Sequence, residues 1–241
     1  ASGSSDPDGN IVKQEWDWNN DGIYDLSSTG ITDKLTQSFL SSGTYTVGLR
    51  VQDDDGATAT DTATVIVKVV PVANAGPDIT VLRCEAVSFD GSGSYDPDGV
   101  IDTYTWAFGD GTTGTGQTTT HTYSTAGTYT ATLKGTVPDV MTTTDTVTVT
   151  VLNPSQGIGD LKLVLKGMHI NLAKERILTS YLDTAQKMTG MGMCPQAVTS
   201  LQSFNMNVKG MTGLYLTPAQ ANTLTAYSNR IITSIQKCGC R

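Results

Sequence analysis

Oxygen-bearing side chains recur at a regular spacing between Asp17 and Asp25. Counted from the first residue, positions 1, 3, 5 and 9 are Asp17, Asn19, Asp21 and Asp25, and position 6 is glycine. A calcium-binding loop uses this spacing to surround the ion with carboxylate and amide oxygens. The bidentate glutamate of such loops is replaced by Ser28. Because calcium takes about six to eight oxygens, the segment either recruits a further carboxylate or is a polar hairpin tip, and both interpretations stay open.

A second group of aspartates belongs to a turn that occurs twice, as Ser5-Asp6-Pro7-Asp8-Gly9 and as Tyr95-Asp96-Pro97-Asp98-Gly99. Each turn is followed by a tryptophan, Trp16 or Trp106, and later by a Gly-Thr-Tyr-Thr segment. The chain therefore contains one module in tandem. About twenty residues that read as two strands precede the second turn, whereas Ala1 aligns with Gly91. We expect the first module to lack its opening strands.

The hydropathy pattern divides the chain into three parts. Apolar residues alternate with polar ones in residues 1–70 and 71–152, which is typical of half-buried strands. Glycine-containing turns interrupt this alternation at the spacing of an antiparallel sandwich. In residues 156–241 the apolar period becomes helical, and Thr217-Pro218-Ala219-Gln220 is a helix start with a capping box. Three apolar helix faces are expected, formed by Leu178, Leu182, Ala185 and Met188, by Ala197, Leu201, Phe204 and Val208, and by Leu224, Tyr227, Ile231 and Ile235.

The second module resembles the PKD domain, an immunoglobulin-like sandwich of extracellular proteins. The resemblance rests on Trp106-Ala107-Phe108-Gly109-Asp110-Gly111, on His121-Thr122-Tyr123 and on Gly127-Thr128-Tyr129. The first module departs from this pattern between Trp16 and Gly22, and Phe39 stands where the second has Tyr123. The resemblance implies two all-β immunoglobulin-like sandwiches, the first without its opening strands. With the helical period of residues 156–241, the chain is predicted to be multidomain, two all-β sandwiches followed by an all-α helical bundle.

The PKD resemblance also implies calcium ligands near the two acidic turns. In the second module these would be Asn74, Ser94, Asp96 and Asp139, and in the first Ser4, Asp6 and Asp54. The alternative is an Asx turn, in which each aspartate binds its own backbone.

The C-terminal third resembles the FIMAH module of secreted bacterial proteins. The matching segments are Cys194, Leu201-Gln202-Ser203-Phe204 and Leu216-Thr217-Pro218-Ala219-Gln220-Ala221. The resemblance implies secretion and bacterial origin, and it defines no ligand.

Four cysteines, an even number, favour disulfides in a chain that looks extracellular. Because a bridge between Cys238 and Cys240 would be strained, Cys194 is predicted to pair with one of them. The other is predicted to pair with Cys84 or with another chain. A redox or zinc site is the alternative, although zinc would need more His or Cys nearby.

Composition and the remaining motifs exclude several functions. The net charge of -8 argues against a nucleic-acid partner, and no apolar stretch reaches the roughly 20 residues needed for membrane insertion. His121 has a structural role in the PKD pattern, and His169 lacks a catalytic partner because Cys194 is expected to be oxidised. No enzyme activity is therefore predicted. Trp16 and Trp106 are predicted to be buried, whereas Trp18 is either a core residue or a platform for a sugar ring.

Together these features predict a non-catalytic structural or adhesive protein, extracellular or at the cell surface, and stabilised by calcium and disulfides. A sandwich without its opening strands exposes an unpaired edge, which favours assembly by strand complementation into a filament or surface layer. The expected partners are copies of the chain or other cell-surface proteins, and polysaccharide is a further candidate. The alternative is a substrate-binding accessory region of a larger secreted hydrolase, in which case Ala1 is only a boundary.

Overall fold

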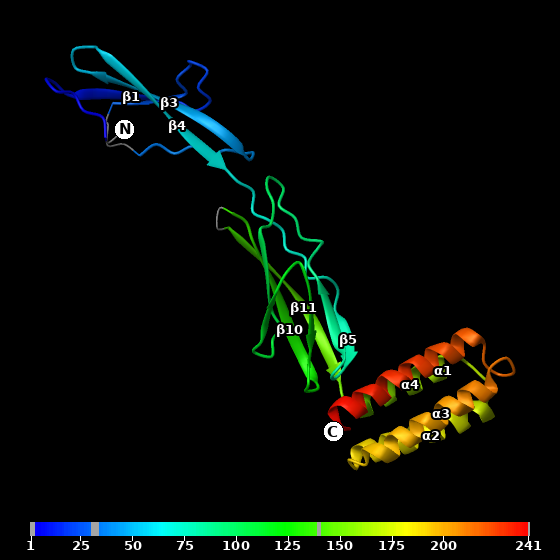
Figure 1. Cartoon of the computed structure of the whole chain (residues 1–241). Coiled ribbons are helices and arrows are strands. Elements are labelled where there is room, and N and C mark those ends of the chain that lie inside the picture. The colour runs from blue at the N-terminus through cyan, green and yellow to red at the C-terminus, as the bar shows by residue number, and fades with distance from the viewer. Residues whose placement is uncertain (1–2, 30–33, 139–140, 241) are drawn as a thin grey trace. The chain divides into compact units, whose positions relative to one another are not determined.

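The computed structural model describes residues 3–29, 34–138 and 141–240 (Figure 1). Two compact units are present: residues 1–70 with 96–99, and residues 71–95 with 100–241. The first contains the first module, and the second contains the second module together with the helices. All-β modules followed by a helical bundle confirm the predicted fold class.

The first unit is built on a single antiparallel sheet with the strand order β2-β1-β3-β4. Its long hairpin turns at Asp53, whose Oδ1 accepts the N–H groups of Asp55 at 3.1 Å and Ala57 at 2.8 Å. Gly56 in this turn has a φ of 88°, which glycine adopts without a steric penalty. The strands are β1 (Ile11–Asp17), β2 (Leu26–Ser28), β3 (Gly43–Asp53) and β4 (Thr58–Val67).

The second module is a two-layer sandwich, with a five-stranded sheet of order β5-β11-β10-β7-β8 and a two-stranded sheet of β6 and β9. Trp106, Phe108, Leu133 and Val149 fill the core between the layers and are at most 2% exposed. The strands are β5 (Ile79–Leu82), β6 (Ala86–Asp90), β7 (Thr103–Ala107), β8 (Thr113–Thr115), β9 (Thr118–Thr122), β10 (Gly127–Thr136) and β11 (Thr142–Leu152).

The first module differs from the predicted incomplete sandwich, because its described residues form one layer. Its counterpart of β9 should lie near residues 34–40, yet this segment contains no strand. In the second module β9 pairs with β6, and β6 has no counterpart among the described residues of the first module. With no strand in the place of β6 to pair with, the described residues of the first module form no second sheet.

Four helices follow the sandwich, α1 (Pro154–Gly167), α2 (Leu172–Gly190), α3 (Cys194–Met211) and α4 (Pro218–Cys238). The three predicted apolar faces are buried in one core, at its edge in the case of Met188 and Tyr227. Helix α1 adds a fourth face and begins two residues before the predicted start of the helical module. Its start is a capping box between Asn153 and Gln156 with proline at the first helical position.

Candidate binding surface of the first module

The inward face of the first sheet is less buried than the same face of the second module. Register places Val65 opposite Tyr45, as Val149 is opposite Tyr129. Val149 is 0% exposed, whereas Val65 is only half-buried. The prediction that Trp16 is buried is wrong, since Trp16 is half-buried while Trp106 is 1% exposed. The difference follows because the described residues of the first module form no second layer to cover this face.

A cleft of about 540 Å³ lies on the first unit. Trp18 stacks on Trp16, with ring centroids 5.2 Å apart and an angle of 6° between the ring planes. The ring centroids of Phe39 and Tyr45 are 4.4 Å apart. The cleft combines aromatic rings with polar side chains, and its lining includes Trp18, Asn19, Asp25, Gln37, Phe39 and Tyr45. It offers apolar surface to a partner, with hydrogen-bonding groups beside it.

The second module shows what occupies the equivalent region when the sandwich is complete. Phe89 of β6 lies 5.2 Å from Trp106 and 5.2 Å from Phe108, measured between ring centroids. These two rings correspond to Trp16 and Trp18 of the first module. The cleft of the first module is therefore bordered by one of these rings, Trp18, which stacks on the other, Trp16.

The edge of the first sheet is also unpaired. In the second module, β5 adds to β11 in parallel, with Val149 opposite Ile79 and Val151 opposite Val81. The equivalent edge of β4, at residues 65–67, pairs with no strand among the described residues. Ile66 in this stretch is 62% exposed. An apolar unpaired edge is a template for a strand from elsewhere.

The acidic loop of β1 and β2 uses its carboxylates to hold its own backbone. Oδ1 of Asp17 accepts the N–H groups of Asn19 at 3.3 Å and Asp21 at 3.2 Å, and its Oδ2 accepts that of Gly22 at 2.7 Å. Asp25 accepts the N–H of Trp18 at 2.8 Å. These contacts close a tight hairpin tip, and calcium binding by this loop stays a prediction.

The acidic turn of the first module brings two carboxylates together. A Cβ added to Gly9 would collide with Asp6 Oδ2 and Asp54 Oδ1, so both oxygens lie beside the same glycine. Burial, a side-chain hydrogen bond with Asp8 and the nearby negative charges of Asp8 and Asp53 raise the pKa of Asp6. Such crowding suits a cation, although the described residues include no cluster of three or more His, Cys, Asp or Glu that could hold a metal. Ser4 is half-buried in the same turn.

The corresponding residues of the second module are described only in part. The N–H of Asn74 donates to Ser94 Oγ at 2.9 Å. Asp96 accepts the N–H of Asp98 at 3.5 Å, as an Asx turn would. Asp139, the fourth predicted ligand, lies outside the described residues.

Calcium is expected to raise the melting temperature of the first unit, because an ion that binds only the folded state stabilises it. The measurement is calorimetry with millimolar calcium and then with a chelator. Asp54→Asn should reduce the shift if the acidic turn holds the ion, and Asp21→Asn should reduce it if the loop does. Identical melts in calcium and in chelator would contradict both sites.

The predicted structural role of His121 is consistent with its contacts in the second module. Its Nε2 lies 2.7 Å from Asp110 Oδ2, and its ring stacks on Phe108 with centroids 4.1 Å apart. Burial raises the pKa of Asp110, but hydrogen bonds from Thr112 and His121 outweigh it and lower that pKa to about 2. The contacts of His121 are thus those of a packed ring that anchors a turn.

The lowered pKa of Asp110 makes the second module sensitive to acid. The stabilisation is complete above the ordinary aspartate pKa of 3.8 and is lost as the pH falls towards about 2. We expect a loss of about 1 kcal/mol, because solvent screens this partly exposed pair. Urea unfolding at pH 6 and pH 2.5 measures it, and Asp110→Asn should lack this part of the pH dependence. A variant as acid-sensitive as the parent would contradict the assignment.

All four cysteines are paired, as Cys84 with Cys238 and Cys194 with Cys240. The pairing agrees with the prediction and selects among its alternatives. Since Cys194 carries no thiol, the Cys194 and His169 nucleophile considered from the sequence is excluded in this state. Among the described residues, no helix is long and apolar enough to cross a lipid bilayer.

Comparison with known proteins gives matches over the two β modules. The PKD domain family model matches residues 1–69 and 68–151. The dyslexia-associated protein KIAA0319 of Homo sapiens is 34% identical over 115 residues, which are 46% of this chain and 11% of that protein. The chain thus spans about a tenth of the length of this relative.

Two solved structures are similar to about a third of the chain. The PKD1 domain of Vibrio anguillarum Epp is 32% identical, with a TM-score of 0.31, and covers 35% of this chain and 96% of that one. A structure described for the promiscuous specificity of carbohydrate-binding modules from the β-sandwich superfamily is 34% identical, with a TM-score of 0.33, and covers 35% of each chain.

Proposed function

Because this chain belongs to the PKD-domain family, we propose that it is a non-catalytic extracellular protein with a structural or adhesive role. Two disulfides support this setting, since such bonds persist in oxidising compartments. The helical part is proposed to be a FIMAH-like module of a secreted bacterial protein.

One observation carries the proposed mode of binding: the first module is a one-layer sheet whose inward face and β4 edge stay open. The second module supplies the shape of the missing element. It would be an extended segment with one strand parallel to β4 and one that places an aromatic side chain near Trp16 and Trp18. Backbone hydrogen bonds to the edge would give affinity, and the aromatic contact would give specificity.

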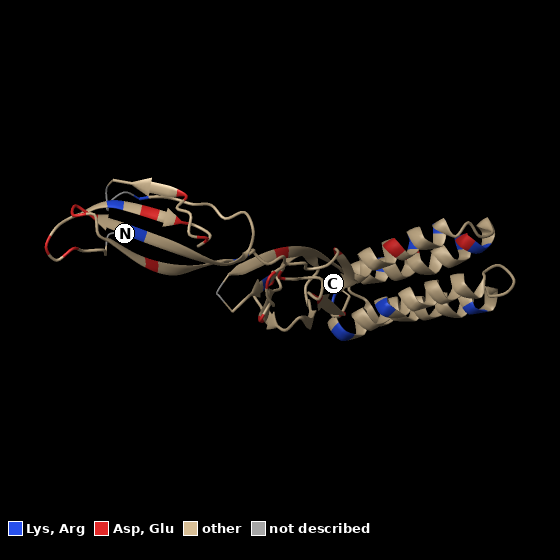
Figure 2. Cartoon of the chain, turned by 90° about the horizontal axis from the view of Figure 1, so that it is seen from above, with Lys and Arg blue, Asp and Glu red and all other residues tan. Residues whose placement is uncertain are grey.

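The donor is proposed to be a second subunit. Each contact would then join the first module of one chain to a different surface of the next chain. Head-to-tail contacts that do not close produce a filament. Calcium at Asp6 and Asp54 would stiffen the turn beside the accepting face. Figure 2 shows the Asp and Glu residues of the first unit mainly in its loops, and β4 carries a single charged residue, Asp61, so a donor strand would meet little charge along this edge.

A synthetic donor peptide tests the accepting surface. Residues 77–90 contain both opening strands of the second module, and Cys84→Ser prevents disulfide exchange. The peptide should raise the melting temperature of the first unit, and a large excess should dissociate oligomers seen by light scattering. A matched peptide with Val87→Asp and Phe89→Asp should do neither, because its inward side chains cannot enter an apolar cleft.

Two results would contradict the proposal. A monomer at all concentrations would refute self-assembly, while a stabilising peptide would still support an accepting surface for another protein. A monomer that also ignores the donor peptide would refute strand acceptance.

The cleft lined by Trp18, Phe39 and Tyr45 supports a second candidate, polysaccharide binding by an accessory region of a larger hydrolase. Aromatic faces beside amide and carboxylate groups suit sugar rings. Soluble oligosaccharides should then change tryptophan fluorescence, and Trp18→Ala should abolish the change. Saturable binding of sugar but not of the donor peptide would favour this function.

A further inference from the structure

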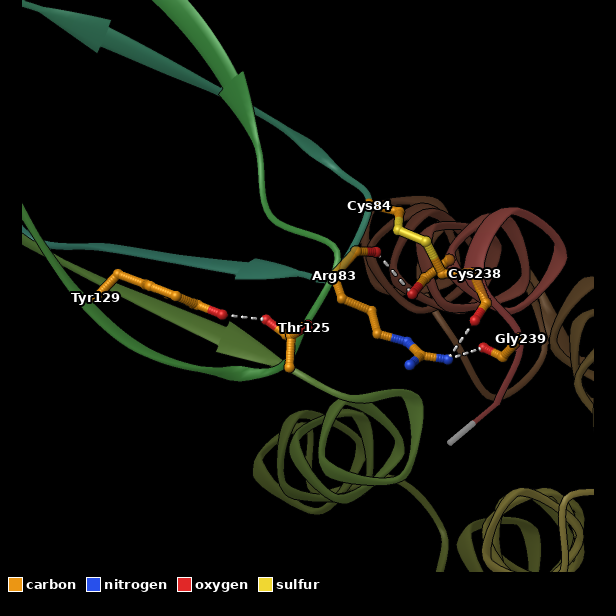
Figure 3. Close-up of a disulfide and its surroundings, with 7 residues drawn as sticks. Arg83, Cys84, Thr125, Tyr129, Cys238 and Gly239 are labelled. Carbon is orange, nitrogen blue, oxygen red and sulfur yellow. Dashed lines mark hydrogen bonds between the residues drawn. A yellow bond between two sulfur atoms is a disulfide. The ribbon is translucent and has the colours of Figure 1, made fainter. Parts of the chain in front are cut away.

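The end of β5 is fastened to the end of helix α4 by several contacts (Figure 3). Cys84 forms the disulfide with Cys238, with Cα atoms 6.3 Å apart. The Arg83 guanidinium donates to the carbonyl oxygens of Cys238, at 2.7 Å, and of Gly239. It thereby satisfies carbonyl groups that the end of a helix leaves without intrahelical partners.

Further contacts flank the disulfide. Ser234 Oγ donates to the carbonyl of Arg83 at 2.9 Å. Glu85 binds Arg230 through two hydrogen bonds of 2.6 and 2.7 Å, which hold the pKa of Glu85 below its ordinary value. Leu82 is 1% exposed and belongs to the core of the helices. The sandwich and the bundle are thus joined at one point by covalent, polar and apolar contacts together.

The covalent connectivity at this point decides how the chain carries tension. Cys84 and Cys238 are 154 residues apart in sequence. A pulling force that enters before Cys84 and leaves after Cys238 passes directly through the sulfur atoms. Everything between them, which includes strands β6 to β11 and all four helices, lies in a closed side loop. The backbone of that loop carries no load as long as the disulfide is intact, whereas residues 71–83, which include β5, stay on the load path.

We propose that the Cys84–Cys238 disulfide is a force-carrying clamp that lets this protein transmit tension while strands β6 to β11 and the helical bundle stay folded. Such a function goes beyond strand acceptance and does not depend on it. The Arg83, Ser234 and Glu85 contacts hold the clamp in place on both sides. The other disulfide, Cys194–Cys240, spans 46 residues and lies inside the bundle, so it contributes nothing to this direct path.

Single-molecule pulling on the full chain with a handle at each end tests the clamp. An unfolded chain extends by at most about 3.5 Å per residue. Adding a reductant while the chain is under tension should therefore release roughly 540 Å beyond the oxidised length, from the 154 residue steps of the loop. The first unit contributes the same unfolded length with the disulfide oxidised or reduced, so its contribution cancels in the difference.

Two double variants provide matched comparisons under oxidising conditions. C84S with C238S should release roughly 380 Å, because the smaller disulfide still shields its 46 residue steps. C194S with C240S should release no additional length. The clamp is refuted if the oxidised parent extends as far as the reduced one, or if C194S with C240S lengthens the oxidised chain. Reducing the folded parent under tension tests the clamp without any variant, so the test holds even if a variant does not fold.

Discussion

Replacing Trp106 by alanine is expected to lower the free energy of unfolding of the second module by about 3–5 kcal/mol, because the side chain fills a closed core. Its ring contacts Phe89 from the opposite layer, and its Nε1 donates to the carbonyl of Gly116 at 3.1 Å. Removing the ring leaves a cavity that the surrounding strands close only in part. Trp106→Ala should therefore be among the most damaging single changes in this chain.

The same substitution at the matching position of the first module should cost much less, about 1–2 kcal/mol. Trp16 stacks on Trp18 but has no opposite layer to leave empty. Urea unfolding followed by far-ultraviolet circular dichroism and fluorescence measures both variants against the parent. Equal losses for Trp16→Ala and Trp106→Ala would mean that the first module is closed in solution, and would contradict the open face.

Removing the Cys84–Cys238 disulfide should have the second large effect. In the chain-entropy treatment, closing a loop of 154 residues stabilises the folded state by about 5 kcal/mol, against about 4 kcal/mol for 46 residues. C84S with C238S should also weaken the junction, because Arg83 and Glu85 are no longer held beside α4. Its cost should therefore exceed that of C194S with C240S.

Thermal unfolding of both double variants, compared with the oxidised parent, measures this difference. We also expect C84S with C238S to separate the melting of the sandwich from that of the bundle, whereas C194S with C240S keeps one shared transition. If C194S with C240S were less stable than C84S with C238S, the Cys84–Cys238 disulfide would not be the dominant link between the sandwich and the bundle.

Local patterns predicted most of this architecture. The period-two alternation predicted strands in residues 1–152. The apolar faces that include Leu182, Leu201 and Ile231 predicted three helices, which share one core. The helical module was predicted to begin at residue 156 and no apolar face was assigned to helix α1, although Asn153, Pro154 and Gln156 together form a capping box with an N1 proline. This helix-start signal was present in the sequence and could have placed the start of the helical module at Pro154.

Other features depended on non-local contacts. The alignment of Ala1 with Gly91 showed no counterpart of β5 and β6 among the residues of the first module. It did not predict that residues 34–40 would contain no strand, because a strand forms only when its partner is present. The half-buried state of Trp16 has the same cause. The pairing of Cys84 with Cys238 required the end of β5 to meet the end of α4, and sequence spacing cannot specify such a contact.

Hydrogen exchange at β4 tests the central claim most directly. The amides of residues 65–67 that point away from β3 are predicted to exchange rapidly in the isolated chain. They should be protected at least about tenfold when the donor peptide of residues 77–90 is present, as an edge strand becomes protected once it is paired. Protection that is absent with the donor peptide, or identical with its Val87→Asp and Phe89→Asp control, would contradict strand acceptance by the first module.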